Sequence, residues 1–492
     1  MPSNLTRRLS AQDAAFLYLE RPGAPLHIGS LGVYEGCIPF ERFVAHMDSR
    51  MPLIPRYRQR LAFVPLSVAH PTWEDDPQFD IRSHVRSVSL PAPGNDEQLR
   101  ELTAKLFAEP LDRGKPLWET YVIEGLEADR TGVLSKVHHA MIDGVSGIEL
   151  LMAILDLSPE PAPPPDAPPW QPKPLPDAGA RLADALLDQL SQQRDLLREF
   201  GETFINPRPR LRQTGDVLRA LRNVSPWLAL PAPRTPFSVR LSPERRAAFS
   251  EVSFVEIREI RTSLGGTVND VVLAVLAGAL RRYLAMRGHS IDGLELRVAV
   301  PVNVRVQEER GSLGNRISCI LTSLPIHEPD PAERLHLIRE RCDELKRENQ
   351  AGALEVLVRT LSLTPVPLQA LAGRGPVANT VVNLICTNVP GPMIPLYSVG
   401  HLMLAHYPLV PLSLDMGLGV GVTSYNQRLY FSLVADPQAV PDVERLKECL
   451  DESFLELRAA AGVSPSDLPE IGGPPSQNGA SVETTAAAEQ PA

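Results

Sequence analysis

The stretch VLSKVHHAMIDGVSGIE, residues 133–149, decides the fold that we expect for this chain. An apolar segment that leads into His138 and His139 predicts a strand, and IELLMAILDL predicts a helix shortly after it. Between them, Gly144 tolerates backbone angles that other residues avoid. The two histidines therefore lie where a strand gives way to a loop, a common position for catalytic groups on a rigid support.

Few kinds of catalytic site fit the cluster around His138 and His139. Adjacent strand residues point to opposite faces, which disfavours a metal shared by His138 and His139. Residues 144–147 do not supply the G-x-S-x-G elbow of a serine hydrolase, and the only thiol we consider is Cys386, which would have to approach in the fold. What remains is one histidine facing a pocket as a general base, since a free imidazole has a pKa of about 6.5. The other is structural, and Asp143 either pairs with an arginine to hold the loop or orients the imidazole.

A plainer alternative is that His138 and His139 are ordinary buried histidines. The pattern H-H-x-x-x-D-G arises by chance in about one chain per thousand of this length and composition. We therefore favour a functional site. The helix that follows is predicted to begin with a capping box made by Ser146 and Glu149.

Composition restricts the class of protein. The formal net charge of −10 over 492 residues disfavours a nucleic-acid binder, which usually presents a basic face. The five cysteines lack metal-ligand spacing, which is typical of reduced thiols in the core of a cytoplasmic protein. We find neither the apolar core of a signal peptide nor a run of about 18 apolar residues. We therefore expect no secretion, no membrane-spanning helix, no metal and no cofactor.

Four regions are predicted: an α/β domain over 1–157, a connector over 158–248, a second α/β domain over 249–462 and a disordered tail over 463–492. The connector begins with SPEPAPPPDAPPWQPKPLPD, which predicts an extended, semi-rigid segment. Residues 180–200 then predict an amphipathic helix with Leu182, Leu186, Leu190 and Leu197 on one packed stripe, and mixed charges on its polar face favour a packed crossover helix over one lying on a membrane. The basic stretch Pro207–Arg246 is either a solvated loop or a contact for anionic lipid or cofactor phosphates.

Strands are predicted over Leu134–His139, Glu295–Val304, Val381–Thr387, Leu418–Ser424 and Leu429–Val434. The last two flank Tyr425–Arg428, a predicted hairpin turn. Thr267–Asp270 predicts the cap of an apolar helix. Within it, Asn269 is either a polar group for catalysis or a residue that merely tolerates the first turn. Because strands and helices mix in both halves, the fold class is α/β or α+β.

With its surroundings, HHAMIDG resembles the signature of coenzyme-A-dependent acyltransferases of the chloramphenicol acetyltransferase type. It is similar in particular to the bacterial wax ester synthase/acyl-CoA:diacylglycerol acyltransferase family. Supporting segments occur in family order over roughly residues 8–460: LSAQDAAFLYLE, PLHIG, PLDRGKPLWE, TVNDVVLAVLAGALRRYL, PVNVR, LGNRIS, TNVPGP and GVTSYNQRLYFSLVAD. Each is weak alone, and their order and spacing carry the resemblance.

The resemblance implies two similar domains with the active site in a tunnel between them, entered by acyl-CoA and by the acceptor alcohol from opposite sides. It implies that His139 is the general base, that His138 supports it, and that Asp143 is mainly structural, with Gly144 completing the motif. The expected reaction moves a long-chain acyl group from acyl-CoA, a co-substrate, to diacylglycerol or a fatty alcohol. No other cofactor is expected.

Two alternatives remain. One is transfer to another acceptor, such as a polyketide diol, a carrier-bound amine or a small alcohol. The other is a non-catalytic lipid-binding or droplet-coating protein that keeps the fold. Because the expected substrates are lipids, we expect peripheral attachment to the cytoplasmic membrane or to lipid droplets.

Three further positions have simpler expectations. Trp118, in the PLWE segment, is expected to anchor the core. Asn388, Pro390 and Gly391 are expected to form a strand end and a rigid turn. Arg305 is a candidate partner of Asp143.

Overall fold

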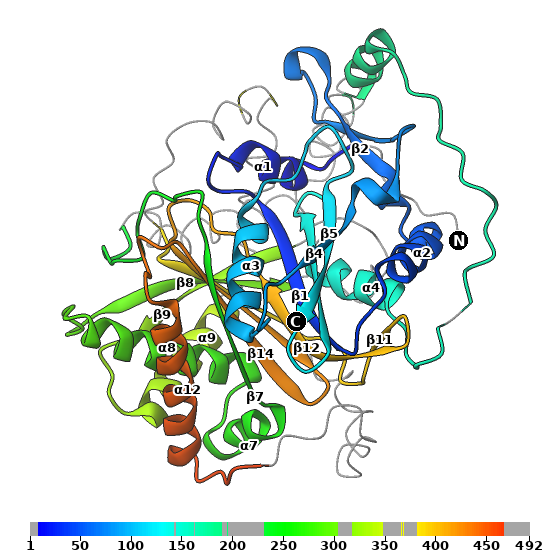
Figure 1. Cartoon of the computed structure of the whole chain (residues 1–492). Coiled ribbons are helices and arrows are strands. Elements are labelled where there is room, and N and C mark those ends of the chain that lie inside the picture. Colours follow the sequence, from blue (N-terminus) through cyan, green and yellow to red (C-terminus); the bar gives the residue numbers. More distant parts are fainter. Residues whose placement is uncertain are drawn as a thin grey trace.

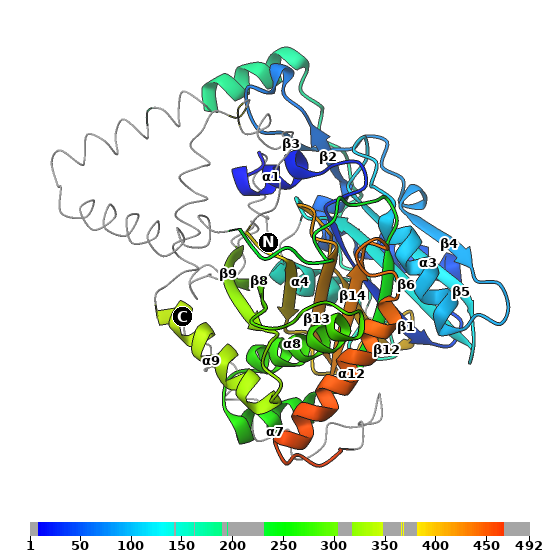
Figure 2. The ribbon, with the colours of Figure 1, turned by 90° about the vertical axis from the view of Figure 1, so that its left-hand side faces the viewer.

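The computed structural model describes residues 8–141, 144–161, 163–188, 194, 231–303, 317–347, 366, 368 and 381–466. Helices and strands mix along the chain, which confirms the predicted α/β class (Figure 1). Two six-stranded sheets form the framework, and each carries its own helices (Figure 2). A small sheet joins β2 (Gln59–Ala62) to β3 (Thr72–Asp75) beside helix α1 (Ala11–Leu19).

The first sheet has the strand order β11-β12-β1-β6-β5-β4. Its strands are β1 (His27–Glu35), β4 (Val85–Ser89), β5 (Trp118–Leu126), β6 (Arg130–His138), β11 (Tyr397–Ser398) and β12 (His401–Leu409). Short 3-10 turns lie among the early elements: η1 (Met51–Leu53), η2 (Pro55–Arg58), η3 (Pro65–Ser67) and η4 (Ile81–Ser83).

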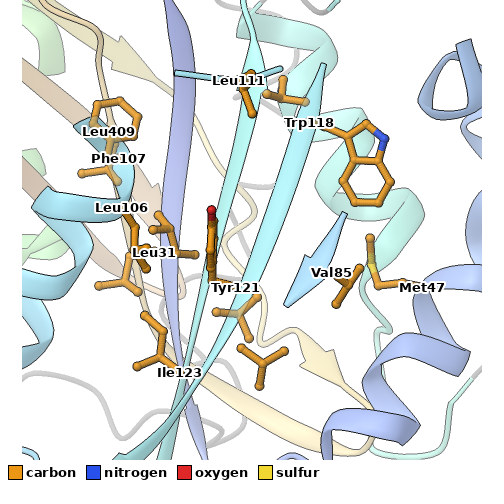
Figure 3. Packing of buried hydrophobic residues seen from close by; sticks show 14 of the residues in the cluster. Leu31, Met47, Val85, Leu106, Phe107, Leu111, Trp118, Tyr121, Ile123 and Leu409 are labelled. Atoms are coloured by element: carbon orange, nitrogen blue, oxygen red, sulfur yellow. The ribbon is translucent and has the colours of Figure 1, made fainter. Parts of the chain in front are cut away.

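Helices cover both faces of this sheet. They are α2 (Phe40–Arg50), α3 (Asp96–Ala108) and α4 (Gly144–Ile154). Because strand side chains alternate between faces, Tyr121 packs toward Phe107 of α3, whereas Trp118 packs on the opposite face near Met47 of α2 (Figure 3). Trp118 is 1% exposed and its indole N–H donates to the carbonyl of Tyr57 at 2.8 Å, so it is the expected core anchor.

The second sheet has the order β7-β14-β13-β10-β8-β9. Its strands are β7 (Arg246–Ser253), β8 (Glu295–Asn303), β9 (Ile317–Pro325), β10 (Leu384–Val389), β13 (Leu418–Tyr425) and β14 (Arg428–Ala435). Four helices accompany it: α7 (Phe254–Leu264), α8 (Val268–Met286), α9 (Pro331–Arg347) and α12 (Val443–Ala460). Helix α8 packs against α9 and α12 and is buried along most of its length, which explains its almost wholly apolar sequence.

One strand from the C-terminal part of the sequence belongs to the first sheet, so the chain has two structural halves, one around each six-stranded sheet, that share this segment. β12 comes from the expected second domain, 249–462, yet it pairs with β1 in the first sheet, with Gly32 opposite His406. It also packs on β13 and β14 of the second sheet. The sheet pairing therefore crosses the boundary expected between the two domains, because the apolar pattern of a strand does not name its partner.

Most local predictions are confirmed. Predicted strands match β8, β10, β13 and β14 to within a few residues, and β10 ends at Val389, just before the expected turn at Pro390 and Gly391. Tyr425 pairs with Arg428 across a two-residue turn whose residues, Asn426 and Gln427, both have positive φ. That is the backbone of a type I′ hairpin turn.

The connector and the tail need correction. Trp170 of the proline-rich segment lies 5.2 Å from the Arg58 guanidinium carbon, so this segment docks on the first half. Residues 178–188 are helical, but Leu186, expected in the packed stripe, is 47% exposed, and Ala185 is the fully buried residue. The expected tail also starts late, because the Ser466 N–H donates to Glu256 at 2.7 Å.

Among the helices that the structure describes, none is by itself long and apolar enough to cross a bilayer. Helices α7 and α8 meet that criterion only when joined, and they bend by 97° where they meet. The five cysteines are free thiols, and Cys37 is exposed rather than in the core as expected.

Candidate functional site

The two histidines lie at the end of β6. The strand ends at His138, one residue earlier than predicted, and His138 pairs with His27 of β1. His138 is 1% exposed, whereas His139 is only partly buried. This difference in burial is in the direction expected for one internal histidine and one that faces a pocket, and the role of each histidine stays a prediction.

A closed ring of contacts holds the backbone from which His139 projects. The His139 N–H donates to the carbonyl of Leu26 at 3.0 Å, and the Leu26 N–H donates to Oε1 of Glu20 at 3.0 Å. On the other side, the Ala140 N–H donates to Nδ1 of His138 at 3.1 Å. Nε2 of His138 lies 3.6 Å from the same Oε1 of Glu20, an electrostatic contact longer than a hydrogen bond, and this contact completes the ring.

This ring determines the proton position on His138. Because Nδ1 accepts from Ala140, the neutral imidazole carries its proton on Nε2. That N–H faces the Glu20 carboxylate. Both ring nitrogens of His138 are therefore directed at the protein framework, and its supporting role stays a prediction.

Glu20 is the charged member of the ring. Burial alone would raise its pKa, but the His138 imidazole, the Leu26 N–H and the Arg113 guanidinium outweigh burial and lower the pKa to about 2. Arg113 Nε donates to Oε2 of Glu20 at 3.0 Å. Glu20 is therefore ionised at neutral pH and fixed from both of its oxygens.

His27 is a third histidine at this site. Its Nε2 donates to the carbonyl of Phe107 at 2.6 Å, which fixes it beside the end of α3. Burial, reinforced by the positive charge of Lys136, lowers the pKa of His27 to about 3. His27 is therefore neutral at physiological pH and adds no charge beside His138.

The ring of His139 has an aromatic neighbour. Phe16 of α1 stacks on it with 4.0 Å between ring centroids and an interplanar angle of 8°. Such a pair restricts rotation of the imidazole and removes water from one of its faces. Sequence reasoning noticed the segment LSAQDAAFLYLE only as a family signature, and no local pattern pointed Phe16 or Glu20 toward the histidines.

The structure describes only some of the remaining motif positions. Asp143 and Arg305 lie outside the described residues, so their expected pairing stays a prediction. Gly144 is the first residue of α4. Because the helix begins there, Ser146 is not its cap, and the expected capping box with Glu149 is wrong.

Asn269 lies in the first turn of α8, in the other half of the molecule from His139. Thr267 is the cap, and its hydroxyl and backbone form a capping box with Asp270. Asn269 takes no part in that box. The cap is therefore complete without Asn269, and its catalytic role stays open as a prediction.

These two positions are expected to respond differently to alanine. Thr267→Ala should lower the free energy of unfolding by about 1 kcal/mol, the usual effect of a lost cap, with the turnover of folded protein unchanged. Asn269→Ala should lower turnover and leave the unfolding curve nearly unchanged. Chemical denaturation and steady-state rates measure both, and a stability loss without a turnover loss in Asn269→Ala would exclude the catalytic role.

The Glu20 ring predicts a pH dependence of stability. Since folding lowers the pKa of Glu20 from 4.5 to about 2, its stabilising contribution is complete above pH 4.5 and fades as pH falls toward 2. The difference in melting temperature between the wild type and Glu20→Gln should therefore be largest near neutral pH and shrink across that window. A difference that stays constant from pH 6 to pH 3 would contradict this assignment.

Cys386 is not available as a nucleophile. It is fully buried in the core of the second half, and burial raises the pKa of its thiol to about 12. A thiolate is the reactive form of cysteine. The structure therefore gives no support to Cys386 as a thiol nucleophile, and the role of the histidine pair stays a prediction.

Comparisons with known proteins show the family to which the chain is similar. Residues 9–272 match the wax ester synthase/diacylglycerol acyltransferase catalytic domain, and residues 313–458 match the C-terminal domain of the same family. A probable diacylglycerol O-acyltransferase of Mycobacterium tuberculosis is 32% identical over 464 residues, covering 92% of this chain and 96% of that protein. A second relative with a diacylglycerol O-acyltransferase name, from Mycobacterium bovis, is 32% identical over 466 residues, covering 92% of this chain and 98% of its own.

Solved structures show the same fold. The wax ester synthase/diacylglycerol acyltransferase from Marinobacter aquaeolei VT8 is 25% identical, has a TM-score of 0.66, and matches 93% of this chain and 100% of its own. The first condensation domain of the calcium-dependent antibiotic synthetase, 15% identical, has a TM-score of 0.61 over 96% of this chain and 99% of its own, and shows the fold alone. The chain therefore belongs to the wax ester synthase/diacylglycerol acyltransferase family, a family of acyltransferases.

Proposed function

We propose that the protein transfers a long-chain acyl group from acyl-CoA to the hydroxyl of diacylglycerol or of a fatty alcohol, with His139 as the general base. The observation that carries this proposal is the contrast within the histidine pair. His138 is buried and committed to the Glu20 ring, whereas His139 is partly exposed on a backbone that the ring holds still. Family membership supplies the acyl-transfer chemistry.

In the proposed reaction, His139 removes the proton from the acceptor hydroxyl. The oxygen attacks the thioester carbonyl, and the tetrahedral intermediate collapses to the ester with loss of CoA thiolate, which takes the proton back from the imidazolium. No acyl-enzyme forms, because holding both substrates at one base supplies the proximity that a covalent intermediate would otherwise provide. The burial of Cys386 agrees with a direct transfer. Asn269 is the polar group that we propose as a candidate on the second half.

The rigid support of His139 favours catalysis over a purely lipid-binding role. Positioning a base within hydrogen-bond reach of a substrate requires a fixed backbone, and the ring of contacts provides one. The choice between diacylglycerol, a fatty alcohol and another acceptor depends on the shape of the acceptor site.

The test incubates purified protein with palmitoyl-CoA and, in separate reactions, with dipalmitoylglycerol, hexadecanol or no acceptor. We expect acceptor-dependent release of CoA and an equal amount of ester, with the faster acceptor identifying the physiological class. A small alcohol and a diol serve as alternative acceptors. CoA release equal to that of a protein-free blank with all of them would overturn the proposed reaction in favour of lipid binding.

We also propose that the protein attaches peripherally to a membrane or lipid-droplet surface through the basic stretch Pro207–Arg246. Within its described part, Arg234, Arg240 and Arg246 are exposed. Arg245 is not available, because it is buried and donates to the carbonyl of Ser242 at 2.7 Å. Charge neutralisation of the three exposed arginines should reduce sedimentation with anionic phosphatidylglycerol vesicles, and unchanged sedimentation would exclude their part in the contact.

A further inference from the structure

Helix α1 presents two groups to the histidine pair from a single turn. Phe16 lies in the helix and Glu20 follows its last residue, four positions later, so both project from the same side. The Glu20 N–H donates to the carbonyl of Phe16 at 3.2 Å, which keeps the two in fixed relation. Ala14 and Leu17 are buried and anchor the helix to the first half.

Phe16 acts on His139, the less buried of the two histidines. Its ring is nearly parallel to that of His139, at 8°, with 4.0 Å between centroids. Any rotation of the imidazole about its Cβ–Cγ bond would break this stack. Because the ring nitrogens lie in the imidazole plane, fixing that plane fixes the direction in which His139 can receive a proton.

Glu20 acts on the buried histidine and on the backbone. Through Oε1 it holds both the Leu26 N–H and the Nε2 side of His138, and Arg113 holds its other oxygen. The Leu26 carbonyl in turn accepts from the His139 N–H. The carboxylate therefore supports the His139 backbone through two routes.

From this geometry we infer that α1 is a positioning element of the active site, in which Phe16 sets the plane of the His139 imidazole and Glu20, through His138 and Leu26, sets its backbone. The inference rests on the proposed function of His139. Neither residue is a catalytic group, since each acts through a histidine. Small displacements of a base reduce turnover strongly: a misplacement of about 1 Å lowers it on the order of 10²-fold.

The substitutions separate positioning from packing. Phe16→Leu keeps apolar bulk and removes the aromatic plane, Phe16→Tyr keeps the plane, and Glu20→Gln keeps the shape and removes the charge. Tyr18→Phe is the matched control on the same helix, because the Tyr18 hydroxyl contacts His70 at 3.0 Å instead of the histidine pair.

The kinetic arm measures kcat and the KM for palmitoyl-CoA. We expect kcat to fall about 10- to 100-fold in Phe16→Leu and Glu20→Gln, because displacement of a catalytic group lowers turnover by about this factor. The KM should change little. Phe16→Tyr should restore most of kcat and Tyr18→Phe should match the wild type. A kcat that falls only in proportion to the folded fraction, or equally in Tyr18→Phe, would overturn the inference.

A second arm does not depend on activity. In protein labelled with ¹³C-histidine, the stacked Phe16 ring should shift the His139 ring resonances upfield, and this shift should vanish in Phe16→Leu and persist in Tyr18→Phe. His139→Asn assigns the resonance. Absence of the upfield shift in the wild type would overturn the inference, whereas its presence without ester formation in any reaction would overturn only the proposed function.

Discussion

Replacing His139 by alanine is expected to lower kcat for ester formation by about 10² to 10⁴-fold, the usual contribution of a positioned general base. The reason is that no acceptor hydroxyl would be deprotonated as it attacks the thioester. Stability should fall little, because His139 is only partly buried and the lost stack on Phe16 is worth about 1 kcal/mol. Rates of CoA release and ester formation, together with a melting curve, measure both effects.

Two controls accompany this variant. His336 lies on α9 and its side chain is 48% exposed, so His336→Ala should leave rate and stability unchanged. His138→Ala should instead lower both, since it opens the ring of contacts around Ala140 and Glu20. Ester formation by folded His139→Ala within a few-fold of the wild-type rate would exclude His139 as the base.

Breaking the buried pair between Arg50 and Asp156 is expected to have the largest effect on stability. Arg50 of α2 lies 2.5 Å from Asp156, which follows α4, and their side chains are 7% and 2% exposed. Asp156 also exchanges backbone hydrogen bonds with Tyr397 of β11. Arg50→Met should lower the free energy of unfolding by about 3–5 kcal/mol, because it removes the positive charge facing a buried carboxylate.

A double-mutant cycle tests the cause. Combining Arg50→Met with Asp156→Leu replaces the pair by apolar groups, so the double variant should lose clearly less than the sum of the two single losses. Denaturant unfolding of the four proteins measures this. Simple additivity of the two losses in unfolding free energy would contradict a buried ion pair. A loss below about 1 kcal/mol for Arg50→Met would contradict it as well, because that is the contribution of a surface pair.

Local structure could be predicted from the sequence at several places. The strand before His138, the cap at Thr267 and Asp270, and the turn at Asn426 and Gln427 all appear as predicted. Each depends on residues within a few positions of one another. Errors arose at boundaries, such as the start of α4 at Gly144 ahead of the expected cap.

Contacts between distant segments could not be predicted from the sequence in the same way. The pattern of β12 is that of any half-buried strand, and nothing in it names β1 as partner. Likewise Leu186 had the spacing of a packed residue and is exposed, while Ala185 fills the contact instead. Which face of an element is buried depends on what lies beside it, and that is set by the packing of the whole chain.

The sequence by itself determined the α/β class, the family and the histidine pair at the end of a strand, because periodicity and a short motif are properties of neighbouring residues. Only the tertiary structure decided that Phe16 stacks on His139 and that Glu20 closes the ring through Leu26 and His138. The contacts of Phe16 with His139 and of Glu20 with His138 join segments more than a hundred residues apart. The free energy that selects them is the sum over the packed core rather than any local preference.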